Sequence, residues 1–315
     1  MNYAIETTDL RKRFGDTHAV DGISLSVAKG SVFGLLGPNG AGKTTTVRLL
    51  ATLLAPTSGS ARVLGHDLLT EAAQIRSKVS LTGQFASVDE DLTGMENLVL
   101  LSRLLGHSWR GARQRASELL QAFDLAEAAG RQARTYSGGM RRRLDIAASL
   151  IVTPEILFLD EPTTGLDPRS RNQVWDMVRD IAAIGTTVLL TTQYLEEADQ
   201  LADRMAVIDH GKVIAAGTSR ELKASVGSGT LKIHLQDAAQ RVAAETLLQS
   251  LTNGQSQATT EGLSVQVTDT AHAMHILHSL NNDGIAVAEF SLGSPSLDEV
   301  FFALTGKAQQ NEVAA

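Results

Sequence analysis

Gly37-Pro38-Asn39-Gly40-Ala41-Gly42-Lys43-Thr44, followed by Thr45, fits the phosphate-binding pattern G-x-x-x-x-G-K-[ST] at every fixed position. A polyphosphate needs many donors in a small concavity, and glycines let several backbone N–H groups converge where a Cβ would intrude. Lys43 adds a point charge for the β- and γ-phosphates, and Thr44 offers a hydroxyl to Mg²⁺. The apolar run 31–36 indicates a buried strand, and residues 45–50 begin a helix whose positive end faces the phosphates. The stretch therefore predicts a P-loop that binds a nucleoside triphosphate and Mg²⁺.

The composition is that of an ordinary globular protein and excludes several kinds of site. With 315 residues, 43% hydrophobic and 20% charged, the chain is expected to form two domains. The formal net charge of −7 gives no global basic field, so nucleic acid is not expected as a partner. The absence of cysteine excludes disulfides and cysteine metal clusters. No signal-peptide pattern is present and no apolar run reaches the ~18 to 20 residues of a membrane span. If the protein works at a membrane, another protein is expected to cross it.

Two different kinds of sequence flank the loop. Residues 3–31 alternate apolar and polar side chains between turn signals, which predicts short antiparallel strands. Residues 71–125 favour helix, and Thr93 with Glu96 forms a capping box, so we expect a helical subdomain over about residues 85–152. Phe14 stands at a turn, where an aromatic is an ordinary surface or core residue more often than a platform for a base.

A second glycine pair lies in Tyr136-Ser137-Gly138-Gly139-Met140, which opens another helix. A Ser-Gly-Gly turn at a helix N-terminus binds anions in some proteins and is a plain helix cap in others, and both interpretations stay open. The run 141–143 is three arginines. Three charges in one helical turn indicate a solvated face more often than a nucleic-acid site.

Two carboxylates follow a buried strand. The apolar run 156–159 predicts a central strand that ends at Asp160-Glu161, where buried carboxylates are costly unless a cation meets them. A Mg²⁺ ion would supply this cation for Asp160, and a role as general base would account for Glu161. After a turn at 163–168 we expect a helix over 170–184, a buried strand over 187–192 that ends at Gln193, and a short acidic helix over 194–203. A hairpin over 205–216 follows, with His210 as an ordinary turn residue.

The composition changes after residue 226, where we place a domain boundary between residues 1–226 and 227–306. Strands at 231–235, 263–267 and 285–290 and helices at 238–251, 271–280 and 296–304 predict a small α+β domain. The loop 252–262 is polar and expected to be mobile, and the tail 307–315 is expected to be flexible. His272, His275 and His278 spread around their helix without an acidic or cysteine co-ligand, so a metal site is not favoured.

The motifs together resemble the ATP-binding subunit of ABC transporters over roughly residues 3–223. They are the P-loop, Gln84, the turn 136–140, Asp160-Glu161 and Gly165-Leu166-Asp167, in the family's order. The stretches 136–143, 191–199 and 295–301 resemble more narrowly the daunorubicin-resistance type of drug-export ATPase.

This resemblance implies an α/β fold with a mixed sheet core, an antiparallel β subdomain and a helical subdomain, followed by the small α+β domain. It also implies an ATP sandwich in which the Ser-Gly-Gly turn of a second copy covers each nucleotide. Phe14 would stack on adenine, Gln84 would join Mg²⁺ and the membrane partner, and Asp167 would couple the two sites. The nucleotide-binding residues implied are Phe14, Val20, Gly37, Asn39, Gly40, Ala41, Gly42, Lys43, Thr44, Thr45, Gln84, Ser137, Gly138, Gly139, Met140 and Asp167. The catalytic residues implied are Lys43, Glu161 and Gln193, and the Mg²⁺ ligands are Thr44, Gln84 and Asp160.

The sequence departs from the family pattern at three places. Tyr136 and Met140 stand where leucine and glutamine are usual, although the Ser137-Gly138-Gly139 core that bears the donors is kept. Gln193 stands where the wider family has a histidine. A glutamine amide can donate a hydrogen bond to the γ-phosphate but cannot take up a proton, so we expect Glu161 to remain the base.

The function expected is ATP hydrolysis that energises a separate integral membrane permease exporting a hydrophobic drug, antibiotic or lipid-like compound. The chain would lie at the cytoplasmic face of the membrane and would not bind the cargo itself. One alternative is an ABC ATPase acting on ribosomes or DNA; those relatives usually carry two cassettes or a long coiled-coil insertion, and neither is present here. A nucleotide-dependent regulatory protein with little turnover is a third reading, which Gln193 keeps open.

Overall fold

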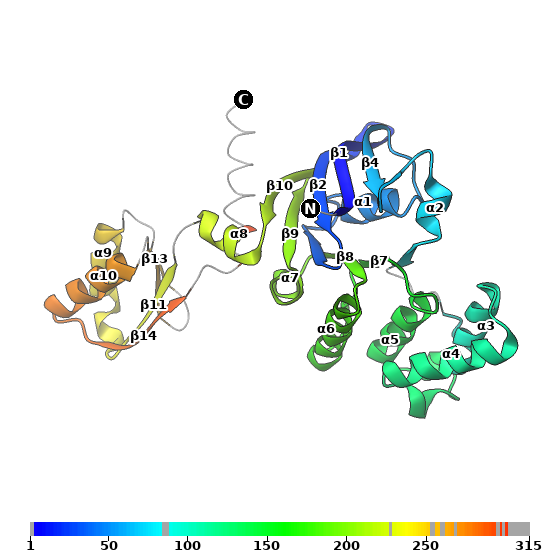
Figure 1. The fold of residues 1–315 in the computed structure, drawn as a ribbon. Coiled ribbons are helices and arrows are strands. Elements are labelled where there is room, and N and C mark those ends of the chain that lie inside the picture. The colour runs from blue at the N-terminus through cyan, green and yellow to red at the C-terminus, as the bar shows by residue number, and fades with distance from the viewer. Residues whose placement is uncertain are drawn as a thin grey trace. The chain divides into compact units, whose positions relative to one another are not determined.

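The computed structural model describes residues 3–83, 88–226, 229–252, 256–258, 262–267, 270–293, 297, 300 and 301. The chain divides into two compact units, Met1–Thr218 and Ser219–Ala315 (Figure 1). The boundary predicted from sequence after residue 226 lies at the end of a helix of the second unit, and that choice of boundary stays a prediction. No helix in the described part of the chain is long and apolar enough to cross a membrane.

A mixed sheet forms the centre of the first unit. Its described strands are ordered β10-β9-β3-β8-β7-β6, with β10 antiparallel to β9 and the others parallel to one another. The bounds are β3 Val32–Leu36, β6 Val79–Thr82, β7 Ile156–Asp160, β8 Thr187–Thr192, β9 Arg204–Asp209 and β10 Lys212–Gly217. Because parallel strands end at one edge, the loops after β3, β7 and β8 are brought together there.

The strand β6 corrects one sequence prediction. Residues 71–125 were expected to favour helix and no strand was predicted there, but Val79–Thr82 pairs in parallel with β7 at the edge of the sheet. This strand is only four residues long and mostly half-buried, so it shows neither the alternation nor the long apolar run that marks a strand in sequence. The helix that precedes it, α2 Ala72–Arg76, is short.

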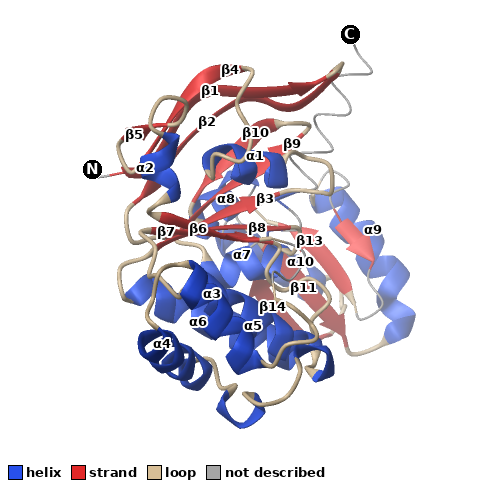
Figure 2. Cartoon of the chain, turned by 90° about the vertical axis from the view of Figure 1, so that its right-hand side faces the viewer, coloured by secondary structure: helices blue, strands red, loops and turns tan. Residues whose placement is uncertain are grey.

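An antiparallel sheet of order β2-β1-β4-β5 lies over α1, on the opposite side of the mixed sheet from α3–α6 (Figure 2). Its strands are β1 Tyr3–Phe14, β2 Thr17–Ala28, β4 Ser58–Val63 and β5 His66–Asp67, and α1 spans Lys43–Leu50. The predicted antiparallel pair is present, with two strands of 12 residues each instead of short ones.

Helices cover the other face of the sheet. Their bounds are α3 Gly94–Leu104, α4 Trp109–Ala122, α5 Gly138–Ser149, α6 Pro168–Ala183 and α7 Leu195–Leu201. The helices α3–α5 form the predicted helical subdomain, and the predicted capping box at Thr93 and Glu96 is present. Two apolar cores result, one on each face of the mixed sheet, and β7 contributes to both. Leu157 and Leu159 pack toward the helices, whereas Ile156 and Phe158 pack toward the antiparallel sheet.

The second unit contains a small α+β fold with its own apolar core. Its described strands form an antiparallel sheet of order β12-β13-β11-β14. The bounds are α8 Ser219–Val226, β11 Thr230–Leu235, α9 Arg241–Leu251, β12 Ser256–Ala258, β13 Leu263–Gln266, α10 Thr270–Asn282 and β14 Val287–Gly293. The strand β12 lies inside the stretch 252–262 that was expected to be a loop. Of the predicted helix 296–304 only residues 297, 300 and 301 are described, and the tail 307–315 lies outside the described residues.

Candidate active site

The P-loop connects β3 to α1 through backbone that glycine alone fits. At Gly42, φ is +104° and a Cβ would lie 2.2 Å from the carbonyl oxygen of Ala19. At Gly37, a Cβ would lie 2.2 Å from the carbonyl oxygen of Ile208. Gly42 is the N-cap of α1, and no described side chain caps this helix, so the N–H groups of its first turn point toward an open pocket.

The pocket has a volume of about 400 Å³. Its lining residues are Ala19, Asn39, Gly40, Gly42, Lys43, Thr44, Thr45 and Glu161. Backbone donors, one ammonium group and a helix N-terminus therefore converge on one space, which is the arrangement that binds phosphate groups.

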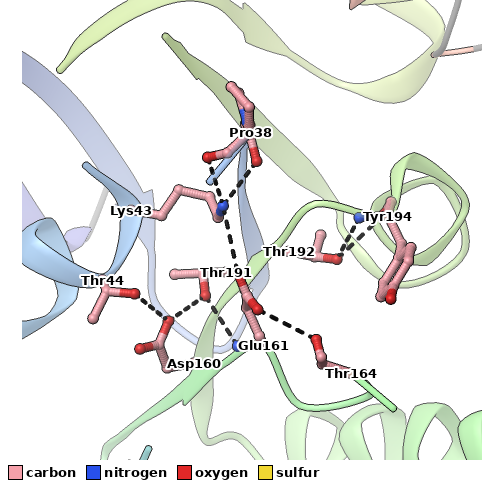
Figure 3. A network of polar contacts seen from close by, with 10 residues as sticks. Pro38, Lys43, Thr44, Asp160, Glu161, Thr164, Thr191, Thr192 and Tyr194 are labelled. Atoms are coloured by element: carbon pink, nitrogen blue, oxygen red, sulfur yellow. Dashed lines mark hydrogen bonds and ion pairs between the residues drawn. The ribbon is translucent and has the colours of Figure 1, made fainter. Parts of the chain in front are cut away.

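Lys43 is the cation of this pocket, and its ammonium group is fully engaged (Figure 3). Nζ donates to the carbonyl oxygens of Gly37 at 2.8 Å and Pro38 at 3.0 Å, and it lies 3.5 Å from Oε1 of Glu161. Burial lowers the pKa of Lys43, and the negative charges of Glu161 and Asp160 oppose this shift. Glu161 thus supplies a negative charge beside Lys43.

Asp160, at the end of β7, is a buried carboxylate bound by hydroxyl groups. Thr44 Oγ1 donates to Oδ1 of Asp160 at 3.0 Å, and Thr191 Oγ1 donates to the same oxygen at 2.6 Å (Figure 3). Hydroxyl and carboxylate oxygens suit Mg²⁺, which keeps several waters and needs few protein ligands. The described residues hold no cluster of three His, Cys, Asp or Glu side chains. Thr44 and Asp160 therefore fit a Mg²⁺ that is shared with phosphate oxygens and water.

Glu161 has an unusual backbone conformation that aims its side chain into the site. Its φ is +49°, which costs a non-glycine residue about 1 to 2 kcal/mol. The N–H of Glu161 is held by the carbonyl oxygen of Thr191 at 3.2 Å and by its hydroxyl at 3.0 Å. Thr164 Oγ1 also donates to Oε2 of Glu161, at 3.3 Å. Local strain at the predicted base is thus maintained by a specific set of hydrogen bonds.

The role of Thr191 was not predicted from sequence. Its hydroxyl donates to Asp160 and accepts from the N–H of Glu161, so one side chain on β8 fixes both carboxylate residues of β7. In the sequence, Thr191 is one of several threonines at the end of an apolar strand. The pairing of Asp160 with Thr191 across two parallel strands, which sets this contact, is not visible there.

The Ser-Gly-Gly turn is a helix cap within this chain. Ser137 Oγ accepts from the N–H of Met140 at 3.2 Å, and a Cβ on Gly139 would lie 2.3 Å from Oγ of Ser170. Tyr136 is buried and donates its hydroxyl to the carbonyl oxygen of Ala128 at 2.8 Å, so the residue that departs from the family pattern serves the core. Ser137 and Gly138 are exposed, and their predicted contact with a nucleotide stays a prediction.

Asp167 caps α6. Its carboxylate accepts from the N–H of Ser170 at 3.0 Å and from Oγ of Ser170 at 2.6 Å, and these hydrogen bonds lower the pKa of Asp167. Gln193 is exposed in the turn between β8 and α7. The proposed coupling by Asp167 and the γ-phosphate contact of Gln193 remain predictions.

The remaining predicted nucleotide contacts differ in what the structure supports. Phe14 is about half exposed at the end of β1, with Nζ of Lys12 5.1 Å from its ring centroid, so its ring is accessible to a base. Val20 is 0% exposed and packs in the core under the antiparallel sheet. The predicted contact of Val20 with the nucleotide stays a prediction. Gln84 lies outside the described residues.

The run of arginines at 141–143 was expected to be a solvated face, and this expectation is wrong. The side chains of Arg142 and Arg143 are 11% and 9% exposed. Arg141 is one-third exposed and pairs with Glu90 at 2.9 Å. All three guanidinium groups bind protein acceptors, which the sequence could not show because those acceptors are mostly backbone carbonyl groups.

Glu197 on α7 is a buried acid that sequence reasoning missed. Its side chain has no exposed surface, and Oε1 accepts from Thr163 Oγ1 at 2.9 Å and from Trp175 Nε1 at 3.2 Å. Burial raises the pKa of Glu197, although hydrogen bonds with Thr192, Thr163 and Trp175 oppose the shift. Because Thr163 lies two residues after Glu161, the acid also supports the loop that follows the base.

One chain thus brings together the P-loop, Asp160 and Glu161, with Gln193 on the neighbouring loop. It does not bring the Ser-Gly-Gly turn to the same pocket, since that turn is absent from the pocket lining and α5 lies apart from α1, with the sheet between them (Figure 1).

Comparison with known proteins agrees with this geometry. The ABC transporter family model matches residues 20–164, and the model of the DrrA1-3-like ATP-binding protein C-terminal domain matches residues 217–305. A daunorubicin/doxorubicin resistance ATP-binding protein from Streptomyces peucetius is 59% identical over 306 residues, which cover 96% of this chain and 92% of that protein. The chain belongs to the ABC transporter ATP-binding proteins of the daunorubicin-resistance type. It is therefore an ABC-type ATPase with a P-loop.

Two further relatives show lower sequence identity. A doxorubicin resistance ATP-binding protein of Mycobacterium tuberculosis is 46% identical over 96% of the chain and 93% of that protein. A Nod factor export ATP-binding protein of Ralstonia nicotianae is 39% identical over 96% of the chain and 94% of that protein. Among solved structures, a nucleotide-free ATP-binding cassette from an ABC transporter matches 70% of this chain and 94% of its own length, with a TM-score of 0.64 and 26% identity. The expected α/β fold with a mixed sheet, an antiparallel subdomain and a helical subdomain is thereby confirmed.

Proposed function

We propose that this ABC ATPase hydrolyses ATP with Glu161 as the base, and that it powers a separate membrane permease exporting a hydrophobic drug-like compound. The observation that carries the catalytic part is the network joining Lys43, Thr44, Asp160 and Glu161 in one phosphate-sized pocket.

The pairing of Glu161 with Lys43 suggests how nucleotide binding prepares the base. In the structure the carboxylate of Glu161 lies 3.5 Å from Nζ of Lys43 and forms an ion pair with it. The γ-phosphate of ATP carries more negative charge than one carboxylate and competes for Nζ of Lys43. Displaced from Lys43, Glu161 stays tethered through its backbone to Thr191 and is free to accept a proton from water.

The chemical step then needs mainly the correct placement of the attacking water and stabilisation of the charge on the phosphate groups. Water attacks the γ-phosphorus, the bond to the β–γ bridging oxygen breaks, and ADP leaves with inorganic phosphate while the water proton passes to Glu161. Lys43 and the N–H groups of the P-loop balance the charge on the phosphate oxygens. Mg²⁺, when bound by Thr44 and Asp160 with Gln84 as a further ligand, would neutralise the charge between the β- and γ-phosphates. Gln193 would donate a hydrogen bond to the γ-phosphate.

A second copy of the chain completes the site in this proposal. The P-loop pocket is open, and Ser137 and Gly138 are exposed at the N-terminus of α5, outside the lining of that pocket. A head-to-tail pair would place each turn over the other copy's nucleotide, with its backbone N–H groups on the γ-phosphate. A solved cassette of the same fold, 24% identical to this chain, is described as dimeric and bound to ADP and phosphate.

The partner and the cargo are inferred from relatives and from one surface. The relatives are named for daunorubicin and doxorubicin resistance and for Nod factor export, which favours transport over action on ribosomes or DNA. Exposed apolar side chains on and between α3 and α4 offer a contact surface for a permease; they are Leu100, Leu104, Leu105 and Trp109. The chain would then sit peripherally at the cytoplasmic face of the membrane and would not contact the cargo.

The test measures both the rate of ATP hydrolysis and the identity of the protein that copurifies with the chain. With purified full-length chain, Glu161→Gln should lower kcat roughly 100-fold or more while ATP binding is kept, because general-base catalysis contributes about 10² to 10⁴. Gln193→Ala should retain measurable turnover. Expressed in cells, the chain should copurify an integral membrane protein and lower doxorubicin accumulation only when that protein is present. Full turnover in Glu161→Gln, or copurification of ribosomes instead, would contradict the proposal.

A further inference from the structure

The guanidinium group of Arg142 joins three segments of the chain. Nη1 donates to the carbonyl oxygen of Gly83 at 2.7 Å, Nε to that of Pro162 at 2.9 Å, and Nη2 to that of Asp160 at 3.3 Å. Nη1 also lies 3.2 Å from Oδ2 of Asp145, one turn further along α5 and 1% exposed. A planar group with five donors is thus bound from several sides inside the protein.

These acceptors are carbonyl groups at functional places. Asp160 and Pro162 flank Glu161, so two of the hydrogen bonds hold the backbone on both sides of the proposed base. Gly83 follows β6 and precedes Gln84. These carbonyl groups lie where the strands end, and a buried carbonyl group without a partner is costly. Arg142 therefore satisfies the ends of two neighbouring strands with one side chain.

Arg142 also lies one turn after the Ser-Gly-Gly turn on a single helix. The segment from Ser137 to Arg142 is a capped first turn of α5, and Gly139 packs so closely on Ser170 that a Cβ would not fit. A short helical segment of this kind moves as a unit. Any displacement of the turn is therefore accompanied by a displacement of the Arg142 guanidinium group.

We propose that Arg142 is a positioning residue that couples the Ser-Gly-Gly turn to the backbone around Glu161 in the same chain. When the turn closes over the nucleotide of a second copy, α5 moves and Arg142 carries the carbonyl groups of Asp160 and Pro162 with it. The state of one nucleotide site is thereby transmitted to the base of the other. This inference rests on the proposed two-copy ATP sandwich and adds a physical connection between its two sites.

The neighbouring arginine supplies a matched control. Arg143 lies on the same helix and is equally buried, but its Nη1 donates to the carbonyl oxygens of Phe123 at 3.1 Å and Asp124 at 3.3 Å. Both acceptors follow α4, inside the helical subdomain. Loss of the Arg143 guanidinium group therefore weakens the packing of α5 on the residues that follow α4. The hydrogen bonds from Arg142 to the backbone on both sides of Glu161 stay unchanged.

The experiment compares Arg142→Lys with Arg143→Lys in the full-length chain. Lysine keeps the positive charge beside Asp145, so the fold is retained, but one ammonium group cannot hold carbonyl groups from two strand ends in the fixed geometry of the guanidinium fork. For Arg142→Lys we expect kcat to fall roughly tenfold or more and the Hill coefficient for ATP to fall from near 2 toward 1. ATP affinity, and ATP-dependent dimerisation measured in a Glu161→Gln background, should stay unchanged. Arg143→Lys should leave kcat and the Hill coefficient unchanged.

Four results would overturn the inference, and together they separate it from the dimer proposal. If Arg142→Lys keeps the parental kcat and Hill coefficient, or if Arg143→Lys lowers both equally, Arg142 has no specific coupling role. If the parental chain itself shows a Hill coefficient of 1 and no ATP-dependent dimer, the two-copy site fails and the inference fails with it. Loss of dimerisation in Arg142→Lys would indicate a damaged turn and would also contradict the proposed role.

Discussion

Thr191→Val removes a single hydroxyl group from the centre of the catalytic network while keeping the shape of the side chain. In the parental chain this hydroxyl donates to Asp160 at 2.6 Å and accepts from the N–H of Glu161 at 3.0 Å. Valine has nearly the same volume and suits a strand. The substitution therefore tests the hydrogen bonds themselves, with little change in packing.

The expected size of the effect follows from the two bonds. The bond to Asp160 involves a charged acceptor and contributes roughly 1.5 to 3 kcal/mol. Loss of the hydrogen bond from the N–H of Glu161 lowers stability less, because this N–H still donates to the carbonyl oxygen of Thr191 at 3.2 Å. We expect the free energy of unfolding to fall by about 1.5 to 3 kcal/mol. If Thr44 turns to Mg²⁺ when nucleotide binds, Thr191 is the donor left on Asp160, and the same loss in the transition state lowers kcat roughly 10- to 150-fold.

The assay is steady-state ATP hydrolysis, with urea unfolding of the same preparations. Thr192→Val is the control, because Thr192 is equally buried on β8 but its hydroxyl binds the backbone of Tyr194 and the side chain of Glu197 instead of the catalytic carboxylates. It should lower stability and leave kcat within about twofold. An unchanged kcat in Thr191→Val, or an equal loss in Thr192→Val, would refute the proposed role of Thr191.

Three further experiments test other parts of the site. Glu161→Gln should bind ATP more tightly than the parent in an equilibrium titration, because Lys43 loses the carboxylate that competes with phosphate; weaker binding would contradict that competition. Gly42→Ala should abolish nucleotide binding, because its Cβ would lie 2.2 Å from a carbonyl oxygen. Gly40→Ala is the control: φ at this position is +84° but no atom lies near the added Cβ, so the substitution should lower stability by only about 1 kcal/mol. Burial raises the pKa of Glu197 in the folded chain, whereas in the unfolded chain this group loses its proton above about pH 4.3. The free energy of unfolding therefore falls as pH rises from about 4.3 toward the raised pKa of the folded chain. Glu197→Gln removes this decline: its Tm should match the parent's near pH 4 and exceed it at pH 8, and a constant difference between the two pH values would exclude the raised pKa.

Local features of the sequence were enough to predict the P-loop and the strand that ends at Asp160. Glycines at fixed spacing and apolar runs act through short-range backbone geometry, which a sequence displays directly. The short strands β4 and β6 were not predicted because they are stabilised by pairing with the distant strands β1 and β7 more than by their own pattern. The strands β5 and β12 pair with neighbouring strands but are too short to show a pattern.

The supporting residues of the site were missed for a related physical reason. Arg142 is 59 positions from its acceptor Gly83, and Glu197 is 34 positions from Thr163. Charged residues are ordinarily exposed, so an interpretation from sequence assigns them to the surface unless a partner is known. Their burial is a consequence of the assembled sheet edge.

The placement of β7 has a consequence for how this protein moves. The strand is hydrogen-bonded to β6 on one side and β8 on the other, and its side chains alternate between two apolar cores. Sliding or tilting it would open both cores at once, so its amide protons should be among the slowest in the chain to exchange with deuterium. The body of β7 is therefore the fixed part of the site, and the motions that accompany each turnover belong to the surrounding helices and to the chain from Asp160 onward, where the strand ends.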